Sequence, residues 1–191
     1  MKCPIIFFKN AHKTKIVAKK NFPEEKWDFA TSLKLKYEGF ESELYSITKN
    51  IKVARSRFSG NKGEEKILAK EIAQAKILSN NFAYIFLLPK LKSIDGKFIK
   101  GPDAIVNGTF FEFKTITGPI NKVERHFRQS REQCENVFLR IIDPKISKDA
   151  VVSKIRQILN DKTYKGGTTG RLLFYLEGSR KLHFLQIEDI K

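Results

Sequence analysis

Two acidic residues and a lysine gather around an Asn-Gly pair in the middle of the sequence. Asp103 precedes Asn107-Gly108, and Glu112 and Lys114 follow it in Phe-Glu-Phe-Lys. Asn-Gly between apolar runs predicts a type I′ hairpin, which would fold Asp103 back beside Glu112. Alternate side chains of a strand share a face, so Glu112 and Lys114 should point the same way. We expect Asp103, Glu112 and Lys114 to converge.

Converging carboxylates between buried strands are costly unless they are paired or bind a metal. Oxygen ligands suit a hard divalent cation, so we expect Mg²⁺ (or Mn²⁺) at Asp103 and Glu112. Such an ion activates water and stabilises charge that develops on a phosphate, while Lys114 orients the water. The alternative is a structural salt bridge between Glu112 and Lys114 on an exposed sheet face.

A third carboxylate, Glu71, stands in a predicted helix. Leu68, Glu71, Ala75 and Leu78 are spaced at three and four residues and form one stripe, so Glu71 should face the sheet. It would serve the same metal site. The alternative is that Glu71 extends its carboxylate to solvent, or pairs with a lysine of its own helix such as Lys70 or Lys76.

The secondary-structure patterns become clear after the turn-rich stretch 59–63. We take this stretch as a boundary between an N-terminal basic region, 1–60, and a second domain, 61–191. Pro4–Lys9 could be a strand. Beyond the boundary the patterns predict the order α-β-β-β-α-β-α-β-β, an α/β fold with a mixed sheet flanked by helices. The expected elements are a helix at 64–78, strands at 82–88, 103–106 and 109–116, a helix at 121–135 capped by Asn121, a strand at 137–142, a helix from the Ser147 cap to 159, and a hairpin of 172–176 with 182–187.

A helical Glu, a strand, Pro-Asp and then Glu-x-Lys resemble the PD-(D/E)XK nuclease superfamily, as does the order αβββαβ. Pro102-Asp103 and Glu112-Phe113-Lys114 carry this resemblance over about residues 64–142. It implies a metal-dependent nuclease in which the carbonyl of Phe113 is a third metal ligand.

The segments Ala75–Leu78, Ile85–Pro89, Gly101–Gly108 and Phe111–Thr115 also resemble the C-terminal tRNA-nuclease domains of contact-dependent growth inhibition toxins. Those domains carry a Gln shortly before an Asn-Val strand, which Gln133 matches. The resemblance implies that Gln133 supports catalysis and that tRNA is the first candidate substrate. If the chain is a toxin, it also implies delivery into target cells, action in the cytoplasm and an immunity protein as partner.

The charge of the chain agrees with a polyanionic partner. Its 191 residues include 37 Lys+Arg and 21 Asp+Glu, for a net charge of +16. Such a charge attracts nucleic acid, although the amino-acid bias of an AT-rich genome is the alternative cause. Two cysteines exclude a disulfide scaffold and a zinc ribbon, and no apolar run is long enough for a membrane span.

Basic side chains also recur along the predicted helix at 121–135. They could follow a phosphate backbone, or form a solvated face with the acidic residues of the same helix. His126 of this helix is a weaker candidate for a general base. The candidate phosphate contacts are Lys122, Arg125, Arg128 and Arg131.

These features together predict a Mg²⁺-dependent endonuclease with catalytic residues Glu71, Asp103, Glu112, Lys114 and Gln133. A DNA endonuclease of the restriction or recombination type is the second candidate. A catalytically silent nucleic-acid-binding protein is the third, and metal-dependent cleavage separates it from both enzymes.

Overall fold

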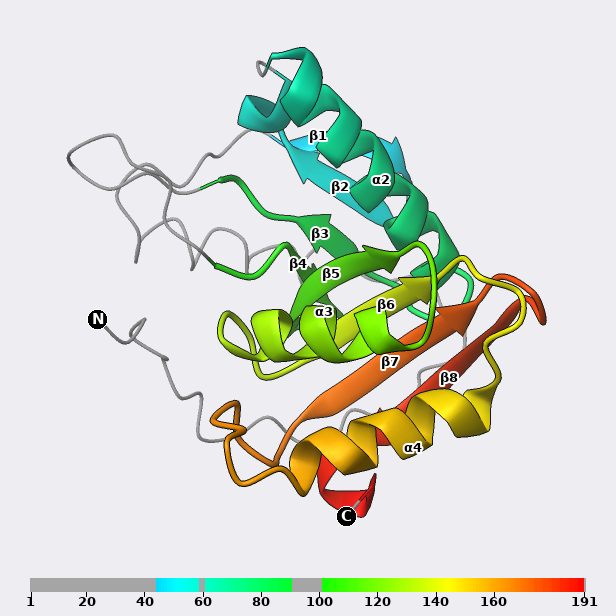
Figure 1. Cartoon of the computed structure of the whole chain (residues 1–191). Coiled ribbons are helices and arrows are strands. Elements are labelled where there is room, and N and C mark those ends of the chain that lie inside the picture. Colours follow the sequence, from blue (N-terminus) through cyan, green and yellow to red (C-terminus); the bar gives the residue numbers. More distant parts are fainter. Residues whose placement is uncertain (1–43, 59–60, 91–100, 191) are drawn as a thin grey trace. The chain divides into compact units, whose positions relative to one another are not determined.

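The computed structural model describes residues 44–58, 61–90 and 101–190 (Figure 1). The chain divides into two compact units, Met1–Thr109 and Phe110–Lys191. Each unit combines strands with helices, which confirms the predicted α/β class. The expected strand at Pro4–Lys9 lies outside the described residues.

The first unit combines short strands with one long helix. Its strand order is β1-β2-β3-β4, in which β2 and β3 are parallel while β1 with β2 and β3 with β4 are antiparallel. Helix α2 packs against β3 and η2. The elements are β1 (Leu44–Thr48), β2 (Ile51–Ala54), the 3₁₀-helix η2 (Arg55–Phe58), α2 (Lys62–Leu78), β3 (Ile85–Leu87) and β4 (Ala104–Val106).

Helix α2 begins at a capping box. The Asn61 side chain accepts hydrogen bonds from the backbone N–H groups of Gly63 and Glu64, and the Glu64 side chain accepts one from the Asn61 N–H. These bonds satisfy N–H groups that the first helical turn leaves without partners. The predicted buried stripe is confirmed, since Leu68, Glu71, Ala75 and Leu78 are all buried.

The second unit has β-α-β-α-β connectivity followed by a hairpin. Strands β5, β6 and β7 are parallel neighbours, and β8 pairs antiparallel with β7. Its elements are β5 (Thr109–Ile116), α3 (Asn121–Arg131), β6 (Val137–Ile141), α4 (Lys148–Leu159), β7 (Arg171–Leu176), β8 (Lys181–Gln186) and η3 (Ile187–Ile190).

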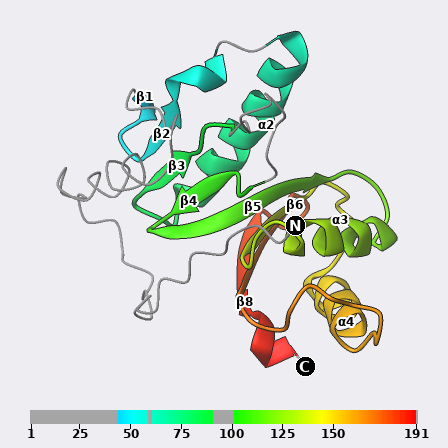
Figure 2. The same ribbon diagram turned by 90° about the vertical axis from the view of Figure 1, so that its left-hand side faces the viewer.

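Helices α3 and α4 cover one face of this sheet (Figures 1 and 2). Phe127 of α3 and Ile155 of α4 belong to the same core as Leu139 of β6 and Phe174 of β7, and all four are fully buried. Parallel crossovers of this kind place helices over a sheet and bury the strands between them. The face that α3 and α4 cover is called the helix face below.

The predicted element order from residue 64 onward is confirmed, with strand β5 at the predicted 109–116. Asn107 and Gly108 have φ values of 46° and 81°, as the central residues of a type I′ turn require. Strands β1 and β2 had no counterpart in the sequence-based prediction. Because β2 pairs with β3, residues before the expected boundary at 59–63 share a sheet with residues after it.

The predicted cap of α3 is wrong. Asn121 is the first helical residue rather than the cap, and Ile120 occupies the cap position without a side-chain hydrogen bond. The backbone carbonyls of Pro119 and Ile120 accept the N–H groups of Lys122 and Val123, so backbone groups close the first turn. The helix also ends at Arg131, four residues before the predicted Glu135.

Candidate active site

Glu71 lies in the interior of the first unit and has a partner that the sequence did not suggest. Glu71 is 5% exposed, and its Oε2 accepts a hydrogen bond from the guanidinium of Arg57 in η2. The same guanidinium donates to the carbonyl of Leu88 at 2.8 Å. The partner is therefore Arg57, rather than Lys70 or Lys76 of the same helix.

Asp103 lies close enough to Glu71 for its charge to act on it. The pKa of Glu71 is raised to about 7, mainly by burial and then by the charge of Asp103, whereas Arg57 and Lys90 oppose the shift. Asp103 precedes β4, and its carbonyl accepts the N–H of Leu88 at 2.9 Å. The structure thus brings together two of the predicted carboxylates.

This pair has the chemistry of a partial cation site. Two carboxylates that repel each other in a desolvated place are stabilised by a divalent cation, and Mg²⁺ takes oxygen ligands of this kind. Gln74, one turn beyond Glu71, is 2% exposed, and its Nε2 has no hydrogen-bond partner among the described residues. In the described ranges no three His, Cys, Asp or Glu side chains form a ready metal cluster, so metal binding by Glu71 and Asp103 stays a prediction.

Glu112 and Lys114 form the corresponding pair in the second unit. Glu112 and Lys114 are register partners of Val137 and Leu139, so both lie on the helix face. The Lys114 ammonium donates to Oε1 of Glu112, whose side chain is 2% exposed against 25% for that of Lys114. The salt bridge that the sequence offered as an alternative is present, but its carboxylate is buried rather than on an exposed face.

Residues after α3 fix the backbone around Glu112. The Glu112 N–H donates to the Asn136 carbonyl at 3.0 Å, and the Asn136 side chain donates to the Phe110 carbonyl at 2.9 Å. The side-chain oxygen of Asn136 also accepts the Arg171 N–H at 3.0 Å. Asn136 therefore ties three segments together beside Glu112. Its Asn-Val context in the sequence was the only signal for this role.

Gln133 and Cys134 lie in the same connection. Gln133 is half-buried, and its Nε2 donates to the Gln129 carbonyl at 3.4 Å, so it bonds within its own segment. Burial raises the pKa of the Cys134 thiol to about 12, and the nearby charge of Glu112 acts in the same direction. The supporting role of Gln133 stays a prediction.

His126 of α3 lies near Lys114. Burial lowers the pKa of His126, and the charges of Arg125, Lys114 and Lys122 lower it further. Its Nδ1 is buried without a hydrogen-bond partner among the described residues. Both effects favour the neutral imidazole, which is the form that can accept a proton.

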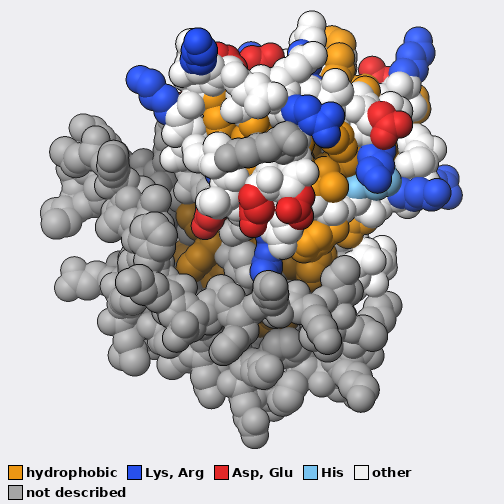
Figure 3. All heavy atoms as spheres, turned by 90° about the horizontal axis from the view of Figure 1, so that it is seen from below, with side chains coloured by type: hydrophobic (Ala, Val, Ile, Leu, Met, Phe, Trp, Pro, Cys, Tyr) orange, Lys and Arg blue, Asp and Glu red, His pale blue; other side chains and the backbone are white. Residues whose placement is uncertain are grey.

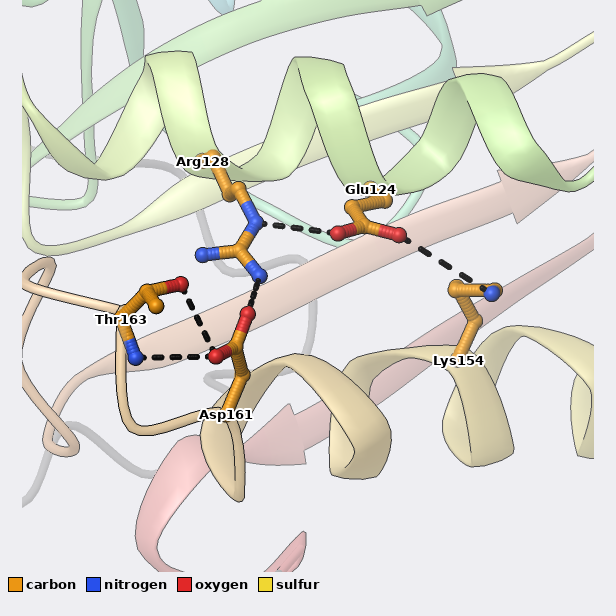
Figure 4. A network of polar contacts seen from close by, with 5 residues as sticks. All are labelled: Glu124, Arg128, Lys154, Asp161 and Thr163. Atoms are coloured by element: carbon orange, nitrogen blue, oxygen red, sulfur yellow. Dashed lines mark hydrogen bonds and ion pairs between the residues drawn. The ribbon is translucent and has the colours of Figure 1, made fainter.

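The basic residues of α3 differ in how free they are to bind phosphate. Arg128 pairs with Glu124 and Asp161, and Lys154 joins this network through Glu124 (Figure 4). The Thr163 backbone and hydroxyl both donate to the second oxygen of Asp161 at 2.8 Å. This network connects α3 to the loop that follows α4.

Arg131 is held inside the second unit. It is 7% exposed and donates to the carbonyls of Glu135 and Thr169, the latter at 2.8 Å. Lys122 and Arg125 are exposed, although Lys122 also donates to the Thr117 carbonyl at 2.9 Å. Lys122 and Arg125 are thus the accessible members of the predicted set.

The described charges on the face drawn in Figure 3 are mixed in sign. Lys and Arg side chains are interspersed there with Asp and Glu and with exposed hydrophobic side chains. The net charge of +16 is therefore not gathered into one basic patch on the described part of that face.

The structure thus contains two charged pairs, Glu71 with Asp103 and Glu112 with Lys114, each within its own unit. In sequence they are joined by β4, the turn at Asn107 and Gly108, and β5. The meeting of Asp103 with Glu112 stays a prediction, as does metal ligation by the Phe113 carbonyl.

Residues 100–169 match the family model of the contact-dependent growth inhibition CdiA C-terminal domain. The matched segment includes Asp103, Glu112, Lys114 and helix α3, whereas Glu71 and Arg57 lie before it. No curated protein and no solved structure matches the chain significantly. The match links this part of the chain to toxin-type effectors. None of the described helices is long and apolar enough to cross a bilayer.

Proposed function

We propose that the chain is a toxin-type, metal-dependent nuclease that hydrolyses phosphodiester bonds in RNA, with tRNA as first substrate. One observation supports this proposal above all: the segment that matches the toxin family model is also the segment that contains the candidate catalytic residues. The segment that resembles the CdiA C-terminal domain contains Asp103, the buried Glu112 and its partner Lys114. The resemblance of Pro102-Asp103 and Glu112-x-Lys114 to PD-(D/E)XK nucleases supports the same reaction.

In this proposal Asp103 and Glu112 hold Mg²⁺ or Mn²⁺, and the carbonyl of Phe113 completes the ligands from the protein backbone. Glu71 adds a third carboxylate or orients a water molecule on the ion. When bound, the ion supplies positive charge that stabilises the phosphate as it is attacked and favours ionisation of the attacking water. The raised pKa of Glu71 beside Asp103 supports this assignment, because a pair that repels without metal gains most from a cation.

Lys114 positions the water that attacks phosphorus, and its ammonium also offsets the negative charge that builds on the phosphate oxygens. In the structure this ammonium is neutralised by Glu112, so a cation at Glu112 would free it for that task. Hydrolysis joins the water oxygen to phosphorus and breaks the bond to one ribose oxygen, which leaves with a proton. Neutral His126 is close enough to Lys114 to sense its charge and is a candidate acceptor for the proton of the water.

The substrate and partners follow from the resemblance and the charge. The tRNA-nuclease domains of contact-dependent growth inhibition toxins favour tRNA, and such a toxin requires an immunity protein in the cell that makes it. The protein would act in the cytoplasm of a target cell after delivery. A DNA endonuclease is the second candidate, because a net charge of +16 attracts either nucleic acid.

A substrate panel tests this proposal. The purified chain is incubated with tRNA, single-stranded DNA and plasmid DNA, each with Mg²⁺ or with EDTA. We expect Mg²⁺-dependent cleavage of tRNA first. Cleavage of plasmid alone would favour the DNA endonuclease, and binding without cleavage of any substrate would favour a silent binding protein.

A further inference from the structure

Arg57 is a buried arginine that the sequence motifs do not include. It lies in η2, is 6% exposed, and precedes both the Pro-Asp motif and the segment that matches the CdiA C-terminal domain. A buried guanidinium is tolerated only where its charge and its donors have partners. Here Nη1 donates to the Leu88 carbonyl at 2.8 Å, and Nη2 donates to Oε2 of Glu71.

These contacts connect the carboxylate of Glu71 to the backbone of Asp103. Arg57 joins Glu71 on α2 to Leu88 at the end of β3, and the Leu88 N–H donates to the Asp103 carbonyl at 2.9 Å. A shift of α2 relative to β3 would therefore break a charged hydrogen bond. The connection therefore holds the Glu71 carboxylate in place relative to the backbone of Asp103.

The two carboxylate oxygens of Glu71 differ in whether they contact Arg57. Oε2 is taken by the guanidinium, while Oε1 makes no hydrogen bond to any residue in the described ranges. This hydrogen bond restrains the carboxylate at one oxygen and leaves the other oxygen to a ligand. Outer partners of this kind commonly orient metal-binding carboxylates.

We propose that Arg57 is a positioning residue, which holds Glu71 so that Oε1 and the carboxylate of Asp103 bind the same divalent cation. This inference rests on the proposed function and deepens it. The part of the chain before residue 60 thereby contributes to the metal site, although it lies outside the motif. Only arginine suits this position, because its rigid planar fork reaches a carbonyl and a carboxylate together. Lysine keeps the charge but places it at a single point.

The test is a calorimetric titration of five proteins with Mn²⁺, after circular dichroism has shown that each one folds. These are the wild type, Arg57→Lys, Glu71→Gln, the double variant of the last two, and Arg55→Lys. Arg55→Lys is the matched control, since Arg55 is an exposed arginine of the same 3₁₀-helix. We expect Arg57→Lys and Glu71→Gln each to weaken Mn²⁺ binding by about 10–100-fold, and the double variant to bind no more weakly than Glu71→Gln. Arg55→Lys should bind as the wild type does.

The outcomes separate this inference from the proposed function. If Glu71→Gln weakens binding but Arg57→Lys does not, Arg57 is only a structural counter-ion and the inference is wrong. The inference would also be wrong if the double variant weakened Mn²⁺ binding by the product of the two single effects. Arg57 would then act independently of Glu71. A wild type that binds no Mn²⁺ would overturn both. If Arg57→Lys does not fold, Arg57→Gln combined with Glu71→Gln removes both charges, and weaker binding than in Glu71→Gln alone would contradict the inference.

Discussion

Replacing Glu71 by glutamine should change how stability depends on pH. Glu71 is a buried carboxylate whose pKa is raised from 4.5 to about 7, first by burial and then by the charge of Asp103. Its side chain is 7% exposed, so solvent screens these effects little. Glutamine keeps the shape of the side chain and an oxygen for Arg57, but it cannot ionise.

The sign of the effect follows from where the proton is bound. Below about pH 4.5 the carboxyl is protonated in both the folded and the unfolded chain, and its contribution to stability is largest. As the pH rises from 4.5 to about 7, the unfolded chain loses the proton while the folded chain keeps it, so stability falls. At about 1.36 kcal/mol per pH unit, the loss over that interval is about 3 kcal/mol, and above about pH 7 it stays constant.

Urea unfolding in EDTA, from about pH 5 to about pH 8, gives the free energy of unfolding of Glu71→Gln and of the wild type. The difference between these two free energies measures the loss. Glu71→Gln should gain up to about 3 kcal/mol over the wild type by the upper end of the range. Glu65→Gln, an exposed residue of the same helix, should follow the wild-type curve. Adding Mg²⁺ should flatten the wild-type curve, because a cation favours the ionised carboxylate. A constant difference between Glu71→Gln and the wild type across the range would refute the reasoning.

Asp103→Asn should abolish cleavage. Its melting temperature in EDTA should equal or exceed that of the wild type, because the substitution removes a charge that repels Glu71. A large drop in melting temperature would mean that Asp103 is structural. Nucleic-acid binding should weaken steeply with salt, and neutralising Lys122 or Arg125 should each lower the slope of the logarithmic plot by about 1. A slope that neither substitution changes would place the phosphate contacts elsewhere. Gly170→Ala should lower the free energy of unfolding, measured in urea, by about 1–3 kcal/mol. Gly170 has φ +107°, and an added Cβ would lie 2.4 Å from the carbonyl oxygen of Glu135. Gly101→Ala, where a Cβ meets nothing within 4 Å, is the control, and an equal loss there would contradict the steric argument.

The parts of the fold with local signals could be predicted from the sequence. The stripe of α2 placed Glu71 in the interior, and Asn107-Gly108 specified the turn, because both patterns depend on residues close together in the chain. Strands β1 and β2 are only five and four residues long, and β1 is mostly exposed, so neither has a clear apolar period.

The partners of the charged residues could not be predicted in the same way. Arg57 lies fourteen residues from Glu71, and only the packing of η2 against α2 brings them together. Asn121 follows Gly-Pro-Ile, and backbone hydrogen bonds from that turn begin the helix before an asparagine side chain can cap it. The sequence identified residues that carry charge, whereas tertiary packing decides which opposite charge each one meets.

We propose above that Asp103 and Glu112 serve one metal-dependent site for phosphodiester hydrolysis. The most direct test of this proposal is the single-turnover rate of tRNA cleavage as a function of Mg²⁺ concentration, in the wild type, Asp103→Asn and Glu112→Gln. Glu132→Gln, an exposed glutamate beyond α3, is the control. We predict no cleavage in EDTA, saturable activation of the wild type and of Glu132→Gln by Mg²⁺, and loss of this activation in Asp103→Asn and Glu112→Gln. Cleavage that persists in EDTA, or Mg²⁺ activation that survives in either variant, would contradict it.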